Sequence, residues 1–324
     1  MRHPIDQLGG AIVSHGPERL RFFTDGWGDL SLIDTITVPT GAPDPVQIEW
    51  VSETAEDGLV TSVGIFESPA DMLPDHAHHG AVTRILPAEG TDRTVVLMAA
   101  WNEHDSKARF GIARRLATKR IASLVLENPY YGIRRPDDLD GQPIRTVSDF
   151  FRMGIGAVME GRGLLATVRE SGETPGVAGY SMGGNMSALV SSTMPFPVAT
   201  APLAAAYSPS PVYLDGALRG GIAWDALGGV EAAEPRLREA LLAASVLDRP
   251  PPDHAKHAVL VSAKSDGYVP PATTELLHAH WPGSELRWIG GGHASLLWFH
   301  KAALATAIAD SFDRLSRSGS APAS

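Results

Sequence analysis

From Thr94 onward, short apolar segments alternate along the chain with longer segments of helical periodicity, and this alternation limits the fold more than any other feature. The apolar segments are continuous, as expected of strands in a parallel sheet that is covered on both faces. Strands that alternate with helices imply right-handed crossovers and a doubly wound sheet. The sequence therefore predicts an α/β fold with a mostly parallel sheet. The strands are expected at 94–100, 121–129, 174–180, 196–207, 257–263 and 285–291.

The composition narrows the classes of partner. The chain has 324 residues, of which 44% are hydrophobic and 20% are charged, as in globular proteins. Its net charge of −10 disfavours a nucleic acid or an anionic membrane surface as the main partner. The lack of cysteine excludes disulfides, thiolate zinc sites and a cysteine nucleophile. Because there is no apolar run of about 18 residues and no start that resembles a signal peptide, we expect a cytoplasmic protein without stable membrane insertion.

A single domain is expected over residues 1–324, with an N-terminal extension at 1–44 and strand-like segments that follow it. Residues 208–255 separate two predicted strands, are rich in Ala, Leu, Glu and Pro, and fit two or three helices. Because a short connection would suffice between those strands, we expect this segment to be a helical cap insertion over the carboxyl edge of the sheet. The alternative is a surface excursion that packs on an outer helix.

The pentapeptide Gly179-Tyr180-Ser181-Met182-Gly183 follows one predicted strand and precedes a predicted helix. A serine at such a strand–turn–helix junction is typical of a nucleophile elbow. The turn forces the serine into a strained conformation, and side chains at 179 and 183 would crowd the neighbouring strand and helix. The start of the helix directs backbone N–H groups, including that of Met182, at a developing oxyanion. In a chain with 33 glycines it is this context, rather than the pattern alone, that favours Ser181 as a nucleophile.

A serine nucleophile needs a base, and the base needs a group that orients it. In sheets with this kind of turn, the acid and then the base follow the serine along the chain. Asp266 comes directly after an apolar strand, and His293 lies on a glycine-rich loop before the last helix. The alternatives are a turn or helix-capping aspartate and a loop histidine that packs near Trp298. Order and context together favour a triad of Ser181, Asp266 and His293.

The remaining histidines are weaker candidates. Asp75, His76, His78 and His79 resemble a metal-binding cluster, but they lie in a turn between strands, where a solvated polar loop is the favoured interpretation. We therefore expect no metal and no cofactor. His104 follows the strand that should supply a second oxyanion donor, and it is a candidate for lining the site.

The most specific motif of the chain is VLENPYYGIRRP, at Val125–Pro136. Together with Val63–Pro69, Gly179–Gly184 and Trp288–His293, it resembles the α/β-hydrolase domain-containing protein 18 family. The matching segments span residues 60–310. The resemblance implies an α/β-hydrolase fold and a serine ester hydrolase, and it leaves the substrate open.

The resemblance also implies catalytic positions, with Ser181 as the nucleophile, Asp266 as the acid and His293 as the base. Family members tend to have a Gly-Thr-Gly-Asp-His-like loop after the third strand, where this chain has Ala-Trp-Asn-Glu-His at 100–104. The missing glycines change the shape expected of the oxyanion hole. The second oxyanion donor is still expected at the backbone N–H of Trp101.

Aromatic and basic residues of the specific motif are candidates for contact with the substrate. Tyr130 and Tyr131 face either the mouth of the site or the core. Arg134 and Arg135 either pair with a substrate anion or form a surface pair with the aspartates at 137–138.

The expected activity is that of a cofactor-free serine hydrolase that cleaves a carboxylic ester or thioester of a small molecule through an acyl-enzyme. In the expected cap, Leu218 and Trp224 are the candidates for lining an acyl pocket. Peptidase and acyltransferase activities use the same groups and stay as alternatives, as does a non-catalytic binding protein of the same fold. The acyl length and the oligomeric state are open, a homo-oligomer included.

Overall fold

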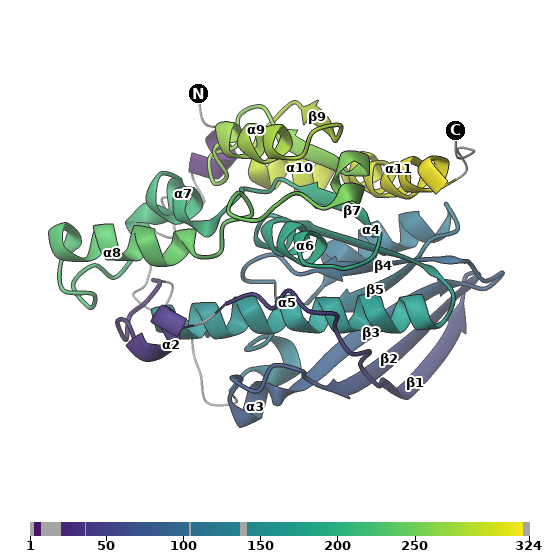
Figure 1. Ribbon diagram of the computed structural model, residues 1–324, viewed down its shortest axis with the longest axis horizontal. Coiled ribbons are helices and arrows are strands. Elements are labelled where there is room, and N and C mark those ends of the chain that lie inside the picture. Colours follow the sequence, from purple (N-terminus) through teal and green to yellow (C-terminus); the bar gives the residue numbers. More distant parts are fainter. Residues whose placement is uncertain (1–2, 8–20, 36, 104, 137–140, 320–324) are drawn as a thin grey trace.

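The structure, a computed structural model, describes the whole chain except residues 1–2, 8–20, 36, 104, 137–140 and 320–324. One sheet of nine strands runs through the molecule in the order β1-β2-β3-β5-β4-β6-β7-β8-β9 (Figure 1). Strands β4 to β9 pair in parallel, and β1, β2 and β3 form an antiparallel edge that joins β5. The predicted α/β fold with a mostly parallel sheet is therefore confirmed. The strands are β1 Glu49–Glu56, β2 Leu59–Glu67, β3 His79–Pro87, β4 Arg93–Met98, β5 Ala122–Leu126, β6 Thr174–Tyr180, β7 Ala199–Leu203, β8 Val259–Ala263 and β9 Glu285–Ile289.

Helices fill most of the connections between the parallel strands. None of those in the described part of the chain combines the length and the apolar character needed to cross a bilayer. The helices are α2 Leu30–Thr35, α3 Asp75–His78, α4 Lys107–Ala117, η2 Gly132–Arg134, α5 Val147–Glu170, α6 Met182–Ser192, α7 Pro209–Leu214, η3 Ala217–Gly221, α8 Val230–Leu242, η4 Asp253–His257, α9 Pro271–His280, α10 His293–Phe299 and α11 Lys301–Gly319.

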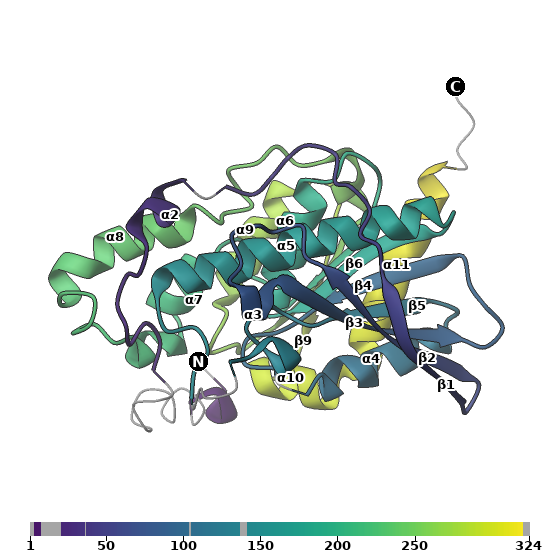
Figure 2. The same cartoon turned by 90° about the horizontal axis from the view of Figure 1, so that it is seen from below.

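The central strands are apolar on both faces because helices cover both. In β4, Val96 and Met98 point into one core and Val95 and Leu97 into the other, as the two-residue period of a strand requires. Helices α5, α6 and α9 pack on the first face, and α4, α10 and α11 pack on the second (Figure 2). The continuous apolar segments of the sequence thus mark strands buried from two sides.

Two of the predicted elements differ most from the sequence prediction. The strand expected at 196–207 is reduced to β7, because the chain leaves the sheet at Ala204, whose φ is 46°. The single helix expected over 293–315 is divided into α10 and α11. At His300 the backbone has φ of −118° and ψ of 24°, which lies outside the α-helical region and ends α10.

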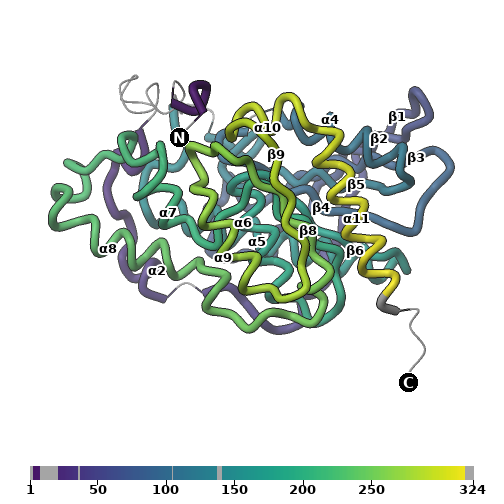
Figure 3. Tube along the Cα trace, turned by 90° about the horizontal axis from the view of Figure 1, so that it is seen from above, coloured from purple at the N-terminus to yellow at the C-terminus, as the bar shows by residue number. Residues whose placement is uncertain are grey.

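Residues 208–255, which the structure describes in full, contain α7, η3, α8 and η4 and no strand of the sheet. Helices α7 and α8 form one end of the molecule (Figures 1 and 3). An ion-pair network ties the segment together, with Arg219 2.7 Å from Glu234 and Arg238 3.1 Å from both Glu234 and Asp215. The segment is therefore a packed unit of helices, as the sequence predicts.

Candidate active site

Ser181 lies on the turn between β6 and α6, in a backbone conformation that a residue with a side chain rarely adopts. Its φ is 60° and its ψ is −117°. The turn is fixed by two backbone hydrogen bonds, in which the N–H of Ser181 donates to the carbonyl of Leu203 at 2.8 Å and the N–H of Asn185 donates to the carbonyl of Ser181 at 3.1 Å. A strained residue of this kind persists only where its surroundings hold it, and such residues cluster at active sites.

The glycines around Ser181 allow β6, α6 and β4 to approach one another. A Cβ atom at Gly179 would lie 2.2 Å from the carbonyl oxygen of Gly183, and one at Gly183 would lie 2.4 Å from that of Met98. These contacts are with backbone atoms, which have no room to move aside. The close approach explains why glycine stands two residues to either side of the serine.

His293 and Asp266 are joined by a hydrogen bond. The Nδ1 atom of His293 lies 2.7 Å from Oδ2 of Asp266, and the carboxylate is wholly buried. The other carboxylate oxygen accepts hydrogen bonds from the backbone N–H groups of Tyr268 at 2.9 Å and Val269 at 2.8 Å. The carboxylate is thereby held with one oxygen toward the imidazole. A proton on Nδ1 leaves Nε2 with a free lone pair, the form that a general base requires.

Burial and two carboxylates determine the proton affinity of the His293 imidazole. Its burial favours the neutral form and lowers the pKa, but the negative charge of Asp266, its hydrogen bond and the charge of Asp6 outweigh that effect. The pKa of His293 is consequently raised above its usual value. Carboxylates therefore stabilise the imidazolium that forms when the ring takes up a proton.

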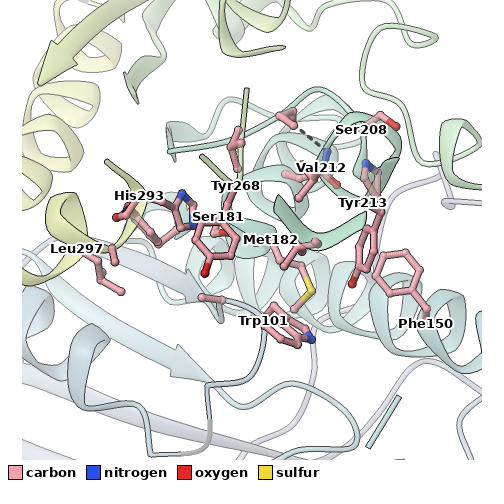
Figure 4. Close-up of a pocket in the computed structure, with 18 of the residues that line it drawn as sticks. Trp101, Phe150, Ser181, Met182, Ser208, Val212, Tyr213, Tyr268, His293 and Leu297 are labelled. Atoms are coloured by element: carbon pink, nitrogen blue, oxygen red, sulfur yellow. Dashed lines mark hydrogen bonds between the residues drawn. The ribbon is translucent and has the colours of Figure 1, made fainter. Parts of the chain in front are cut away.

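Ser181 and His293 line the same cavity, which has a volume of about 260 Å³. Figure 4 shows them at one end of it, with Phe150 and Tyr213 at the other. The rest of the wall is largely apolar. It includes Ala100, Trp101, Met182, Pro209, Val212 and Leu218.

Met182 and Trp101, the two residues predicted to supply oxyanion donors, both line this cavity. Met182 is the first residue of α6, so its N–H has no acceptor within the helix and is available to a ligand. Trp101 lies on the loop after β4, and its ring packs 4.9 Å from that of Phe22.

A buried ion pair shapes the loop that carries Trp101. The Nε atom of Arg109 donates to both carboxylate oxygens of Glu103 at 3.0 Å, and Glu103 in turn accepts a hydrogen bond from the N–H of Ala100 at 3.1 Å. Arg109 also donates to the carbonyl of Leu97 at 2.8 Å, at the end of β4. At the positions where members of the family that this chain resembles tend to have glycines, this chain has a loop that is held by the Glu103–Arg109 ion pair. No feature of the sequence pointed to that pair.

Two predicted aromatic contacts with the substrate are not found, because Tyr130 and Tyr131 both lie in the hydrophobic core and neither is part of the cavity wall. The hydroxyl of Tyr130 donates to Asp149 at 3.3 Å, and burial raises the pKa of both phenols. Of the two alternatives, the structure therefore supports the one in which both tyrosines face the core.

The two candidates from the predicted cap behave differently. Leu218 lines the cavity. Trp224 does not, because its ring lies 5.2 Å beneath the guanidinium group of Arg219 and packs against the core. His104 lies outside the described residues.

Arg134 is a structural residue. Its guanidinium group is buried 2.6 Å from Glu160, and Glu160 also accepts a hydrogen bond from the hydroxyl of Ser68 at 2.6 Å. It is therefore buried away from the cavity, and the aspartates at 137–138 of the predicted surface pair lie outside the described residues. Arg135 donates to the carbonyl of Gly141 at 2.8 Å.

The histidine cluster between β2 and β3 makes ordinary polar contacts. His79 lies 3.1 Å and His78 lies 3.8 Å from Glu67, and the ring of His76 meets that of Tyr130 edge-on. Within the described part of the chain, no group of three or more His, Asp or Glu residues is arranged to hold a metal ion. The expectation of a metal-free site stays a prediction.

Comparison with known families identifies the fold family of the chain. A sequence model of the family described as alpha/beta hydrolase domain containing 18 matches residues 20–246 and 228–314. The chain belongs to this family. The resemblance seen in the motifs is confirmed, and the match includes the segments that carry Ser181, Asp266 and His293.

Solved structures of other α/β-hydrolases share the fold of this family member. It is similar to an acetyl xylan esterase from Paenibacillus sp. R4, with 13% sequence identity, a TM-score of 0.59 and 95% of each chain covered. Acetyl xylan esterase 1 from Thermoanaerobacterium sp. JW/SL YS485 has 14% identity and a TM-score of 0.56, over 91% of this chain and 98% of the other. A cold-adapted esterase from an Arctic intertidal metagenomic library has 15% identity and a TM-score of 0.53, over 82% and 99%.

Several residues of this α/β-hydrolase surround the site without having been predicted from the sequence. Phe150 comes from α5, at a distance along the chain from every motif, and Tyr213 comes from α7. Trp298 lies at the rim of the cavity and is exposed. Asp6 contacts the loops of the acid and of the histidine, and in the sequence it is an ordinary aspartate that follows Ile5 and belongs to no motif. Phe150, Tyr213 and Trp298 could have been noticed in the sequence because they are aromatic. However, aromatic residues occur in hydrophobic cores as well as in cavity walls.

Proposed function

We propose that this α/β-hydrolase cleaves a carboxylic ester or thioester through an acyl-enzyme on Ser181. The observation that supports the proposal best is the 2.7 Å hydrogen bond between Asp266 and His293, in a cavity that also contains a serine in a strained elbow conformation. A nucleophile, a base and a group that orients the base are the parts that acyl transfer needs.

In the proposed reaction, the Oγ atom of Ser181 attacks the acyl carbon while Nε2 of His293 takes the hydroxyl proton. The carbonyl oxygen becomes an oxyanion, which the backbone N–H groups of Met182 and Trp101 stabilise. As the tetrahedral intermediate collapses, His293 returns the proton to the leaving alcohol or thiol. Water then attacks the acyl-enzyme with His293 as the base, and the carboxylic acid leaves with Ser181 regenerated.

The walls of the cavity favour an apolar acyl group. The cavity has a volume of about 260 Å³, and apolar side chains form most of its lining. Five of its lining residues belong to 208–255, which is why we assign that segment the role of a substrate-selecting cap. They are Ser208, Pro209, Val212, Tyr213 and Leu218.

A fluorophosphonate probe tests the proposal directly. Intact-protein mass spectrometry should show one adduct on the unmodified chain and none on Ser181→Ala, and p-nitrophenyl esters of graded chain length should be turned over by the first protein alone. A correctly folded chain that neither takes the label nor turns over any ester would instead be a binding protein of this fold. An adduct at another residue would show that the nucleophile is wrongly assigned.

A further inference from the structure

Asp6 is a buried carboxylate that binds the backbone of the candidate active site from outside the sheet. It lies on a helical turn at residues 4–7, and none of its surface is exposed. Its Oδ2 atom accepts hydrogen bonds from the N–H of His293 at 2.7 Å and from that of Gly267 at 2.9 Å. Its Oδ1 atom accepts from the N–H of Ala294 at 3.1 Å. Three backbone donors therefore converge on a single side chain.

The three donors come from the two loops that carry the acid and the base. Gly267 follows Asp266 directly, and the other two N–H groups belong to His293 and its neighbour. A negative charge that accepts several backbone hydrogen bonds forms strong, charge-assisted contacts. Asp6 thus fixes the distance between the two loops independently of the hydrogen bond between the catalytic side chains.

Further contacts hold the N-terminal segment, by which we mean residues 3–7, against the two loops. The N–H of His3 donates to the carbonyl of Ser265 at 3.0 Å, in the loop of the acid. A Cβ atom at Gly292 would lie 2.5 Å from Oδ2 of Asp6 and 2.3 Å from Cβ of His3. Glycine at 292 is therefore what allows the N-terminal segment to approach the histidine loop so closely.

The main chain of His293 is anchored at both ends. Its N–H donates to Asp6, and its carbonyl accepts a 2.6 Å hydrogen bond from the hydroxyl of Tyr180. The rings of Tyr180 and Tyr268 lie 5.0 Å and 5.3 Å from the imidazole. Among the described residues, the charges of Asp266 and Asp6 both raise the pKa of His293.

We propose that Asp6 is a positioning residue for the reaction, which holds the catalytic histidine in register with the acid and the serine and makes the N-terminal segment part of the active site. This inference rests on the proposed function, in which His293 is the base. Asp6 touches no reacting atom and does not itself line the cavity. It acts through the backbone of the histidine loop, to which it is hydrogen-bonded.

The test is the substitution Asp6→Asn, which keeps the shape of the side chain but removes its charge. The amide can accept two of the three hydrogen bonds and must turn its own NH₂ group toward the third donor. Because small displacements of a catalytic group are costly, kcat on a p-nitrophenyl ester should fall on the order of 10²-fold, with KM changed by less than about twofold. The pKa of the His293 imidazole, followed by NMR of ring-labelled histidine, should also fall. The His293→Gln variant assigns the resonance.

The control is Asp25→Asn, which removes an exposed aspartate of the same N-terminal region that pairs with Arg145 on the surface. It should change neither kcat nor the NMR titration. An unchanged His293 titration in Asp6→Asn would overturn the proposal, even if stability fell. The NMR measurement does not require turnover, so the two possible failures can be told apart. If only the proposed function were wrong, the titration of His293 would still respond to Asp6→Asn, but the unmodified chain would have no esterase activity.

A measurement on the unmodified protein covers the case in which Asp6→Asn does not fold. The amide protons of Gly267, His293 and Ala294 should be protected from hydrogen exchange, since all three donate to a buried carboxylate. Rapid exchange of these amides in the native chain would show that the N-terminal segment does not stay bound to the loops, and the proposal would be wrong.

Discussion

The guanidinium group of Arg109 lies 3.0 Å from both carboxylate oxygens of Glu103, and this pair holds the loop that carries Trp101 beside the candidate nucleophile. Both side chains are at least nine-tenths buried. A loop with glycines can approach an oxyanion because nothing projects from its backbone. Here the loop has ordinary side chains, and the ion pair between Glu103 and Arg109 holds its backbone in place.

The first prediction concerns this pair. Glu103→Gln leaves the charge of Arg109 buried without its partner, so the free energy of unfolding should fall by about 3–5 kcal/mol. If the N–H of Trp101 is an oxyanion donor, kcat should fall by about 10²–10³-fold while KM changes little. Urea unfolding and steady-state kinetics measure the two effects.

The control for the first prediction is Lys107→Ala, which removes the other ion pair of this region. Its side chain is 82% exposed and lies beside Asp105, so the loss should be below about 1 kcal/mol. If Glu103→Gln lowers stability and leaves kcat intact, the loop does not provide the second donor.

The second prediction concerns the acid. Asp266→Asn should lower kcat by about 10⁴-fold, because an amide that donates to Nδ1 places the imidazole proton on Nε2, toward the serine. Asp215→Asn is the matched substitution, since Asp215 forms a half-exposed pair with Arg238 in the 208–255 segment. Comparable losses in the two variants would mean that Asp266 is not the acid.

The third prediction concerns pH. A base works in its neutral form, and the pKa of His293 is raised above 6.5 by Asp266 and Asp6. The acidic limb of kcat/KM should therefore have its midpoint above pH 6.5. The same shift affects stability, since the folded protein binds this proton more tightly than the unfolded chain. That contribution is fully present below pH 6.5 and is lost as the pH rises through the folded-state value. A limb with its midpoint below pH 6.5 would contradict the assignment of His293 as the base.

The fourth prediction uses a histidine outside the site. Burial lowers the pKa of His254 from 6.5 to about 4, and its Nε2 atom lies 3.1 Å from the hydroxyl of Ser191. Here the unfolded chain binds the proton more tightly, so the contribution of His254 to stability is present above pH 6.5 and is lost as the pH falls toward 4. The loss amounts to about 3 kcal/mol.

The variant His254→Gln tests this effect because glutamine does not titrate. Melting temperatures measured between pH 8 and pH 4 should decline less steeply in the variant than in the unmodified chain. Part of the slope should stay, since burial also lowers the pKa of His257. Equal slopes in the two proteins would show that His254 is solvated in the folded state.

The sequence predicted those parts of the architecture that depend on interactions between residues close together in the chain. Strands β4 to β8 were recognisable because burial on two faces leaves a continuous apolar run in the local sequence. Ser181, Asp266 and His293 could be proposed as a group because each stands where a strand of the predicted sheet ends. Strand ends are local features, and the topology of the fold brings them together.

The residues that sequence reasoning missed act over long distances in the chain. Asp6 contacts backbone groups 261 and 287 residues away, and no periodicity or motif links positions so far apart. From the sequence, Tyr130 could face either the mouth of the site or the core, and Trp224 was a candidate for the acyl pocket because it lies in the predicted cap. An aromatic ring fits a cavity wall and a core equally well. The face on which each ring lies is decided by its partners, which are Asp149 for Tyr130 and Arg219 for Trp224.

The last prediction tests the 208–255 segment as the part that selects the substrate. Leu218 lines the cavity, so Leu218→Ala should enlarge it and shift the preference among p-nitrophenyl esters toward longer acyl chains. Leu218 is also 5% exposed, so the substitution should cost about 2–5 kcal/mol of stability. Trp224→Ala should leave the chain-length profile unchanged, because Trp224 contacts Arg219 and is not part of the cavity wall.

Loss of stability alone could imitate a change in activity, and Leu237→Ala separates the two effects. Leu237 is fully buried in α8 and does not line the cavity, so its truncation should lower the melting temperature without changing the order of the esters. If Leu218→Ala reduces turnover of every ester by the same factor, as a destabilised chain would, the 208–255 segment packs beside the cavity without choosing the substrate. A changed order in Leu218→Ala alone would identify this segment as the selective wall.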